Sequence, residues 1–212
     1  MIAKLMGDGA LLSGEMRVVL KGIRARAKSL LGIEDVQWGR LVMNRETRRL
    51  VDELQPDKLK VLEVSGEYWG GLGLFREYTS VSYPEYNVCD SVLPETFDLV
   101  IAEQVFEHLL WPYRAGKNIH RMLNMNGHFL ITTPFLIRVH DTPVDCTRWT
   151  ETGIKYFLAE CGFPLETIQT GSWGNRACIR ANYRKWVNYN PLIHSLRNEP
   201  EFPYVVWALA RK

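Results

Sequence analysis

The polar segment HDTPVDCTRWT concentrates the side chains of this chain that are best suited to chemistry. Its His140 carries an imidazole that titrates near neutral pH, and Asp141 or Asp145 could fix the tautomer of that ring. A neutral imidazole can remove the proton from an attacking hydroxyl group, so we predict that these three residues are catalytic. Arg148 and Trp149 are expected to bind substrate. In an alternative interpretation, Asp145 and Arg148 form an ion pair that stiffens the loop, with Trp149 packed beneath it.

A second set of polar side chains follows the apolar run FDLVIA at residues 97–102. Glu103 and Gln104 come directly after this run, and ligands of parallel sheets bind at the carboxyl ends of the strands. We predict that these two residues contact a cofactor and that His108, further along, contacts the substrate. Alternatively, Glu103 caps the next helix, and Glu107 and His108 tie that helix to a neighbouring loop.

Apolar runs bounded by turn residues predict the strands that must position these groups. Six such runs lie at residues 59–65, 78–83, 97–102, 127–133, 165–170 and 204–210. Helical periodicity and caps predict helices at 9–31, about 34–54, 105–125 with a break near Trp111-Pro112, and 150–161 with Thr150 as N-cap. The strand, helix and strand between residues 97 and 133 form a parallel crossover unit, which predicts an α/β fold.

The sequence FDLVIAEQVFEHL, followed by a helix that ends RMLNMNGHFLITTP, resembles the second half of a class I S-adenosylmethionine (SAM)-dependent methyltransferase domain. The resemblance covers roughly residues 58–165 and implies SAM as cofactor. It also implies a three-layer α/β/α sandwich with a Rossmann-like, doubly wound, mostly parallel sheet, here with extra N-terminal helices. The methyltransferase-like domain would occupy residues 57–212. Residues 1–56 would form a helical extension that acts as a lid, an interface or a cover for one side of the domain.

In this family an acidic residue and a glycine-rich turn follow the first strand, because the cofactor lies close against backbone N–H groups. The corresponding segment here reads EVSGEYWG, in which Glu63 and Gly66 match and Ser65 stands where a glycine is usual. The resemblance therefore implies that these three residues bind the cofactor.

The second strand of the family usually ends in an acid that binds the ribose hydroxyls. Here Ser82 is nearest to that position, and Glu85 follows it in the next turn. Asp90 stands where the family places an acid near the adenine amino group, although residues 84–95 are too few for the usual helix and third strand. On this basis all three residues are assigned to the cofactor. Trp173 is assigned to the acceptor, because an indole near a loop can stack on a sugar ring.

The resemblance implies that the protein is an enzyme, a SAM-dependent methyltransferase. We favour O-methylation of a small molecule, with a sugar or oligosaccharide first, because a segment rich in His and Asp suits alcohol deprotonation. The alternatives are an N-methyltransferase of a small molecule and a non-catalytic binding or scaffolding subunit, which the irregular glycine turn suggests. A divalent metal such as Mg²⁺ is compatible with the carboxylates but not required by them.

Composition sets further limits on partners and location. The net charge of +2 gives no reason to expect nucleic acid as the main partner. No apolar run approaches the roughly 18 residues of a membrane span, and the four cysteines without a CxxC pair fit a reducing compartment. We therefore expect a cytoplasmic protein that does not contact membranes. We also expect a homo-oligomer, most simply a dimer.

Overall fold

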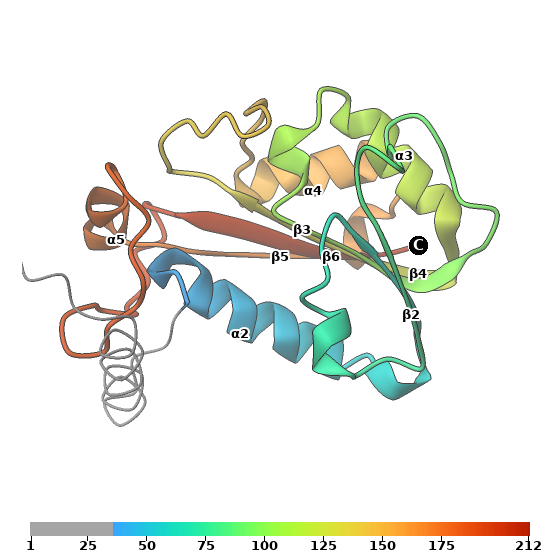
Figure 1. The fold of residues 1–212 in the computed structure, drawn as a ribbon, viewed down its shortest axis with the longest axis horizontal. Coiled ribbons are helices and arrows are strands. Elements are labelled where there is room, and N and C mark those ends of the chain that lie inside the picture. The colour runs from blue at the N-terminus through green and yellow to red at the C-terminus, as the bar shows by residue number, and fades with distance from the viewer. Residues whose placement is uncertain (1–35) are drawn as a thin grey trace, which may run out of the picture.

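The computed structural model describes residues 36–212 of the chain (Figure 1). The helix expected at 9–31 and the greater part of the expected N-terminal extension lie outside the described residues. Within the described part of the chain, no helix is long and apolar enough to cross a membrane.

A six-stranded sheet forms the centre of the molecule, in the order β2-β1-β3-β4-β6-β5. The strands are β1 Lys60–Val64, β2 Glu77–Val81, β3 Phe97–Glu103, β4 Leu123–Pro134, β5 Ile168–Trp173 and β6 Val205–Arg211. The first four run parallel to one another. Because β6 is antiparallel to both β4 and β5, it is the reversed strand of this sheet. The expected mostly parallel sheet is confirmed.

Helices cover both faces of the sheet (Figure 1). One face carries α2, Trp38–Asp52, and the other carries α3, Pro112–Met122, and α4, Glu151–Glu160; the short α5, Arg176–Ala181, follows β5. Successive strand residues point to opposite faces. Accordingly, Val61 and Leu130 pack with α2, whereas Leu62 and Phe129 pack with α3 and α4. The molecule is therefore the expected three-layer α/β/α sandwich.

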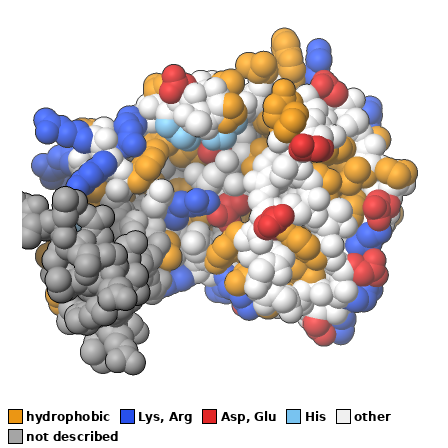
Figure 2. Space-filling view, in the orientation of Figure 1, with side chains coloured by type: hydrophobic (Ala, Val, Ile, Leu, Met, Phe, Trp, Pro, Cys, Tyr) orange, Lys and Arg blue, Asp and Glu red, His pale blue; other side chains and the backbone are white. Residues whose placement is uncertain are grey.

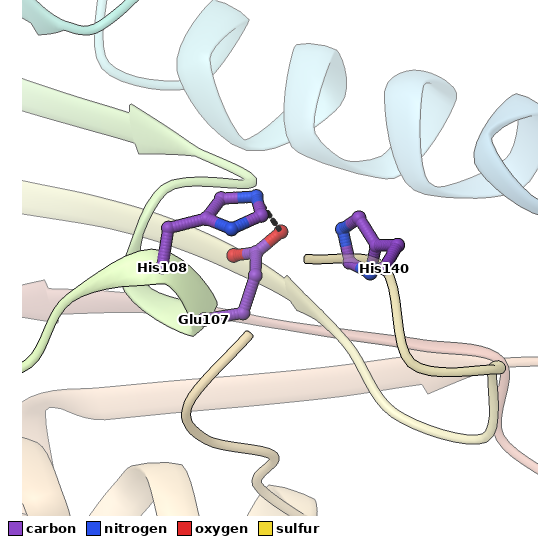
Figure 3. A group of neighbouring side chains, drawn as sticks. All are labelled: Glu107, His108 and His140. Atoms are coloured by element: carbon purple, nitrogen blue, oxygen red, sulfur yellow. Dashed lines mark ion pairs between the residues drawn. The ribbon is translucent and has the colours of Figure 1, made fainter. Parts of the chain in front are cut away.

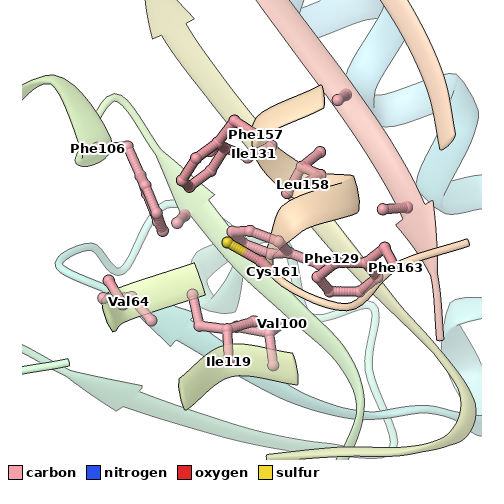
Figure 4. Close-up of a cluster of buried hydrophobic side chains, with 14 of the residues drawn as sticks. Val64, Val100, Phe106, Ile119, Phe129, Ile131, Phe157, Leu158, Cys161 and Phe163 are labelled. Carbon is pink, nitrogen blue, oxygen red and sulfur yellow. The ribbon is translucent and has the colours of Figure 1, made fainter. Parts of the chain in front are cut away.

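Large aromatic side chains fill the core beneath α3 and α4 (Figure 4). Phe106, Phe129, Phe157 and Phe163 are each at most 2% exposed and share one cluster with Ile119. The Phe106 ring lies 5.6 Å from the Phe129 ring and 5.8 Å from the Phe157 ring. Burying a side chain of this size contributes about 2–3 kcal/mol. Phe106 thus anchors the short segment after β3 that contains Glu107 and His108.

The segment that connects β3 to β4 differs in part from the sequence expectations. The break expected near Trp111-Pro112 within residues 105–125 is confirmed, but the part before it is a 3₁₀ helix, Phe106–His108, and α3 ends at Met122. Pro112 has no N–H to continue a helix and is favourable at a helix start, so α3 begins there. β4 then begins at Leu123, earlier than expected. Residues 84–96 form turns without helix or strand, as their short spacing predicted.

Candidate active site

The carboxyl ends of the four parallel strands β1 to β4 lie along one edge of the sheet, where ligands bind in folds of this type. The segments that leave these strands carry most of the site residues expected from the sequence. Figure 2 shows histidine, acidic and basic side chains close together on the face in view.

Glu63 organises the turn that follows β1. It is 2% exposed and accepts hydrogen bonds from the Trp69 N–H at 3.0 Å and the Tyr78 hydroxyl at 2.7 Å. Burial, together with this carboxylate, raises the pKa of Tyr78, which stays a neutral donor. A Cβ on Gly66 would lie 2.5 Å from Glu63 Oε1, so a larger residue there would displace the Glu63 carboxylate. Glu63 therefore shapes the turn from inside the protein.

Ser65 has a left-handed backbone conformation, with φ at 59°. Glycine adopts this conformation without strain, which is a physical reason for the glycine usual at this position in the family. For serine the strain is on the order of 1 kcal/mol. The Ser65 N–H donates to the Val81 carbonyl at 2.7 Å and so fastens the turn to the end of β2. The turn keeps its shape although the glycine is replaced.

Ser82, Glu85 and Asp90 are exposed, in or next to the turns that follow β2. The Asp90 carboxylate accepts a hydrogen bond from Asn87 Nδ2 at 2.7 Å, and the Asp90 N–H donates to the Asn87 carbonyl at 3.0 Å. These bonds make a tight surface turn. Any cofactor contact of Asp90 would therefore be made at the surface and not in a buried pocket.

Glu103 ends β3 and faces α2. Its side chain is 12% exposed, pairs with Arg40, and accepts a hydrogen bond from Trp69 Nε1 at 3.1 Å. Burial raises the pKa of Glu103, and the charge of Arg40 counteracts this rise. The alternative that Glu103 caps the next helix is wrong, since the 3₁₀ helix Phe106–His108 has no side-chain cap. Sequence reasoning missed Arg40, because its role depends on how α2 packs against the sheet.

Gln104 ties the end of β3 to β4. Its backbone N–H donates to the Thr132 carbonyl at 3.0 Å, and its Nε2 donates to the Thr132 hydroxyl at 3.1 Å. Its backbone is left-handed, with φ at 57°, which turns the chain out of the strand. The contacts of Gln104 therefore fix the path of the chain toward Glu107.

Asp145 holds the loop that follows β4. Its side chain is 5% exposed, pairs with both terminal nitrogens of Arg148, and accepts a hydrogen bond from the His140 N–H at 2.8 Å. Burial alone would raise the pKa of Asp145, but Arg148 and the His140 N–H outweigh it and lower that pKa. The stiffening ion pair is thus present. Asp141 is exposed, and Asp145 is the acid that lies beside His140.

The two tryptophans expected at the acceptor lie in the core. Trp149 is 9% exposed, and its ring centre is 5.2 Å from that of Phe157. Trp173 is 2% exposed, and its Nε1 donates to the Leu196 carbonyl at 3.0 Å. Rings buried to this extent have no face left for a sugar, so the geometry gives Trp149 the packing role of the alternative interpretation. The expectation that Trp173 lies in an accessible loop was wrong, because it is the last residue of β5.

Trp186 is an indole that contacts the loop after β4, residues 135–149, here called the acceptor loop. It is 37% exposed, and its ring centre lies 5.8 Å from that of His140, at a right angle. The Arg138 guanidinium lies 3.9 Å over the same ring. The sequence marked Trp186 only as one of several indoles near loops, because it lies in a segment without regular periodicity and is far from His140 in the chain.

Glu107, His108 and His140 converge at the middle of the sheet edge (Figure 3). One potential ligand atom from each lies within 4.8 Å of the other two. His108 Nε2 is 3.7 Å from Glu107 Oε1, and the two imidazole ring centres are 5.0 Å apart. The Glu107 carbonyl also accepts the Cys146 N–H at 2.7 Å. The 3₁₀ helix is therefore tied to the acceptor loop, as the alternative interpretation expected.

Burial controls the protonation of these three side chains. Glu107 is 1% exposed, and burial raises its pKa to about 7, although a hydrogen bond from its own backbone N–H and nearby positive groups oppose the rise. Burial also lowers the pKa of His140, although Asp145 acts in the opposite direction. At neutral pH the His140 ring is therefore neutral, and Glu107 is close to its midpoint. Groups in this state can accept a proton, as a general base must.

Residues 74–131 match the family model described as a methyltransferase domain. A SAM-dependent methyltransferase from Archaeoglobus fulgidus has a similar structure, with 14% identity, a TM-score of 0.54, and coverage of 82% of this chain and 94% of that chain. One from Mesorhizobium loti gives 16% identity, a TM-score of 0.51, and coverage of 74% and 93%. The N-methyltransferase NodS from Bradyrhizobium japonicum, in complex with S-adenosyl-L-homocysteine (SAH), has 15% identity, a TM-score of 0.50, and coverage of 88% of this chain and 97% of that chain. No curated protein matches the chain.

These findings confirm the resemblance stated from the sequence. The protein has the fold of class I SAM-dependent methyltransferases, and the matched segment runs from just before β2 into β4. At 14–16% identity the solved structures show the shared fold, and the family model shows the match to a methyltransferase domain over residues 74–131. The matched segment begins after the turn that contains Ser65 and Gly66, so the case for those residues rests on their geometry.

Proposed function

We propose that the protein transfers the methyl group of SAM to a hydroxyl group of a small molecule, with a sugar or oligosaccharide as the preferred acceptor. The observation that carries this proposal is the position of His140, a neutral imidazole held beside Asp145 at the same sheet edge as the turn after β1. An amine that is already unprotonated can attack without a base, whereas an alcohol needs one. A base held in place therefore favours a hydroxyl acceptor.

The cofactor would lie on the turn after β1. Gly66 has no side chain to block the approach of a ligand to the backbone, and the carboxylate of Glu63 is turned inward. Ser82 and Glu85 are exposed and would meet the ribose, with Asp90 next to the adenine. Glu103 and Gln104 already have protein partners, so they would shape the methionine end of the site.

Methyl transfer needs the acceptor oxygen, the methyl carbon and the sulfur in line. The oxygen forms a bond to the methyl carbon while the carbon–sulfur bond breaks, and the sulfonium becomes the neutral thioether of SAH. In this proposal the hydroxyl proton passes to His140, whose Nδ1 lies 3.3 Å from Asp145 Oδ2. The exposed ring of Trp186 would stack on the acceptor.

Calorimetric titration with SAM, and separately with SAH, tests the cofactor half of the proposal. Binding of either in the micromolar range supports it, and transfer of labelled methyl from SAM to a panel of sugars, phenols and amines then tests the acceptor. Transfer to amines alone would overturn O-methylation. Failure of the folded protein to bind SAM or SAH would favour a non-catalytic binding subunit. The expected dimer and cytoplasmic location stay predictions.

A further inference from the structure

The side chains of Glu107, His108 and His140, here called the Glu-His-His cluster, have the composition of a metal centre. One carboxylate oxygen and two imidazole nitrogens lie within 4.8 Å of one another. Metal–ligand bonds of about 2.1 Å place neighbouring ligand atoms roughly 3 to 3.5 Å apart. Shifts of about 1 Å at the ends of these side chains would therefore close the cluster around an ion.

The His108 imidazole is held through the nitrogen that a metal would not use, and the corresponding nitrogen of His140 lies next to a carboxylate. His108 Nδ1 contacts the Val144 carbonyl oxygen, which can only accept, so Nδ1 carries the proton and Nε2 the lone pair. His140 Nδ1 lies 3.3 Å from the Asp145 carboxylate, close but not aligned as a hydrogen bond, which leaves His140 Nε2 for a ligand. Metal-binding histidines have such a carbonyl or carboxylate partner, because it fixes the tautomer and the ring.

One oxygen of the Glu107 carboxylate lacks the partner that its burial requires. Its Oε2 is buried without a hydrogen-bond partner among the described residues. Its Oε1 is 3.7 Å from His108 Nε2, which is too far for a hydrogen bond. A buried carboxylate without a cation or hydrogen bonds is costly. In Figure 3 the carboxylate lies between the two rings, where a cation would supply the missing partner.

We propose that the Glu-His-His cluster binds one divalent transition-metal ion of the class of Zn²⁺, Mn²⁺, Fe²⁺ or Co²⁺, through Glu107 and the Nε2 atoms of His108 and His140. Two imidazoles with one carboxylate favour these ions over Mg²⁺ and Ca²⁺, which prefer oxygen ligands. Three protein ligands leave coordination positions open to oxygen atoms of an acceptor.

The role of the ion, though not its binding, rests on the proposed function. An acceptor hydroxyl coordinated to the ion would be oriented toward the methyl group, and its pKa would fall. His140 would then serve as a ligand instead of as the base, and the hydroxyl, whose pKa the ion lowers, would release its proton to water before the oxygen attacks the methyl carbon. The substrate class that fits best is a hydroxyl with a second oxygen beside it, as in a vicinal diol, because two oxygens can occupy two open positions.

Metal binding is tested on untagged protein that has been treated with a chelator and dialysed. Calorimetric titration with Zn²⁺, Mn²⁺ and Co²⁺ is expected to give one ion per chain, and Co²⁺ should show the visible bands of nitrogen and oxygen coordination. Cluster variants should bind at least about 100-fold more weakly, and variants of the same residue types outside the cluster should bind normally. The cluster variants are Glu107→Gln, His108→Asn and His140→Asn, and the matched controls are Glu166→Gln and His120→Gln.

Wild-type protein that binds no ion would overturn the inference, and so would folded cluster variants that bind like the wild type. If a variant fails to fold by circular dichroism, the stoichiometry and Co²⁺ spectrum of the wild type decide the question alone. SAH titration of the same samples separates the two proposals. Metal binding without SAH binding rejects the proposed function and keeps the metal site, and SAH binding without metal binding does the reverse.

Discussion

The two halves of the sheet edge differ in whether their buried carboxylates have hydrogen-bond or ion-pair partners. In the cofactor half, formed by the turns after β1 and β2 and the end of β3, Glu63 receives two hydrogen bonds and Glu103 is paired with Arg40. In the acceptor half, formed by the 3₁₀ helix and the loop after β4, Glu107 Oε2 has no partner among the described residues. There His140 also keeps one nitrogen for a ligand.

Under the proposed function, this difference separates cofactor binding from methyl transfer. A carboxylate that is saturated with internal donors fixes a backbone turn, and a turn of small residues is what a cofactor needs for close approach. A buried group without a partner has a shifted pKa and stays able to exchange a proton or bind a cation. We therefore expect substitutions in the cofactor half to act by changing the shape of the turns. Substitutions in the acceptor half should act by changing the charge and protonation of the site.

The largest effect is expected from the pH dependence of Glu107. Because burial raises its pKa from 4.5 to about 7, the folded protein keeps a proton that the unfolded chain releases between these values. The free energy of unfolding of the metal-free protein should therefore fall by up to about 3 kcal/mol as pH rises through this range. Urea unfolding of wild type and Glu107→Gln at pH 5 and pH 8 measures the difference. A difference that is independent of pH would contradict the raised pKa.

Substitution of His140 should separate chemistry from cofactor binding. His140→Ala is expected to lower turnover by about 10²-fold, because the acceptor hydroxyl loses its base or its metal ligand, while SAH affinity stays nearly unchanged. Steady-state kinetics and SAH titration measure the two quantities, with His120→Gln as control. Normal turnover of His140→Ala would remove this residue from the mechanism and would erase the proposed contrast between the two halves.

Arg40 tests whether the cofactor half depends on internal pairing. Arg40→Ala leaves Glu103 buried without its cation and is expected to cost about 2 kcal/mol, a value discounted because the Arg40 side chain is 33% exposed. The matched control is Arg48→Ala, whose partner Asp52 is 50% exposed and which should cost less than about 1 kcal/mol. Urea unfolding measures both changes. Equal losses would show that the Glu103 pair acts like an ordinary surface pair.

The smallest effect is expected at Asp90. Because this residue lies in an exposed turn, Asp90→Ala should weaken SAH binding by less than about 1 kcal/mol, the range of a solvent-exposed hydrogen bond. SAH titration measures the change, with Glu95→Gln as control. A loss of several kcal/mol would mean that the turn closes over the cofactor and is buried in the complex.

Much of the fold could be predicted because its signals are local. Thr150 caps α4 as expected, since its side chain accepts the Gly153 N–H. Each strand was recognisable from an apolar run, but the run at 165–170 was placed too early, because residues 165–167 form a 3₁₀ helix and β5 is Ile168–Trp173. The break expected near Trp111-Pro112 is confirmed, because α3 begins at Pro112. The part before the break is a 3₁₀ helix, Phe106–His108, and periodicity alone does not distinguish so short a helix from an α-helix.

The sequence alone determined that polar residues follow parallel strands and therefore share one edge, because apolar runs mark each strand locally and a strand–helix–strand crossover makes neighbouring strands parallel. Only the tertiary structure decided which of these side chains meet. It placed Asp145 beside His140, brought Glu107 to the same point from another segment, and buried Trp149. The physical reason is that loops have no periodicity, so contacts between them depend on the path of both segments and on what each one buries.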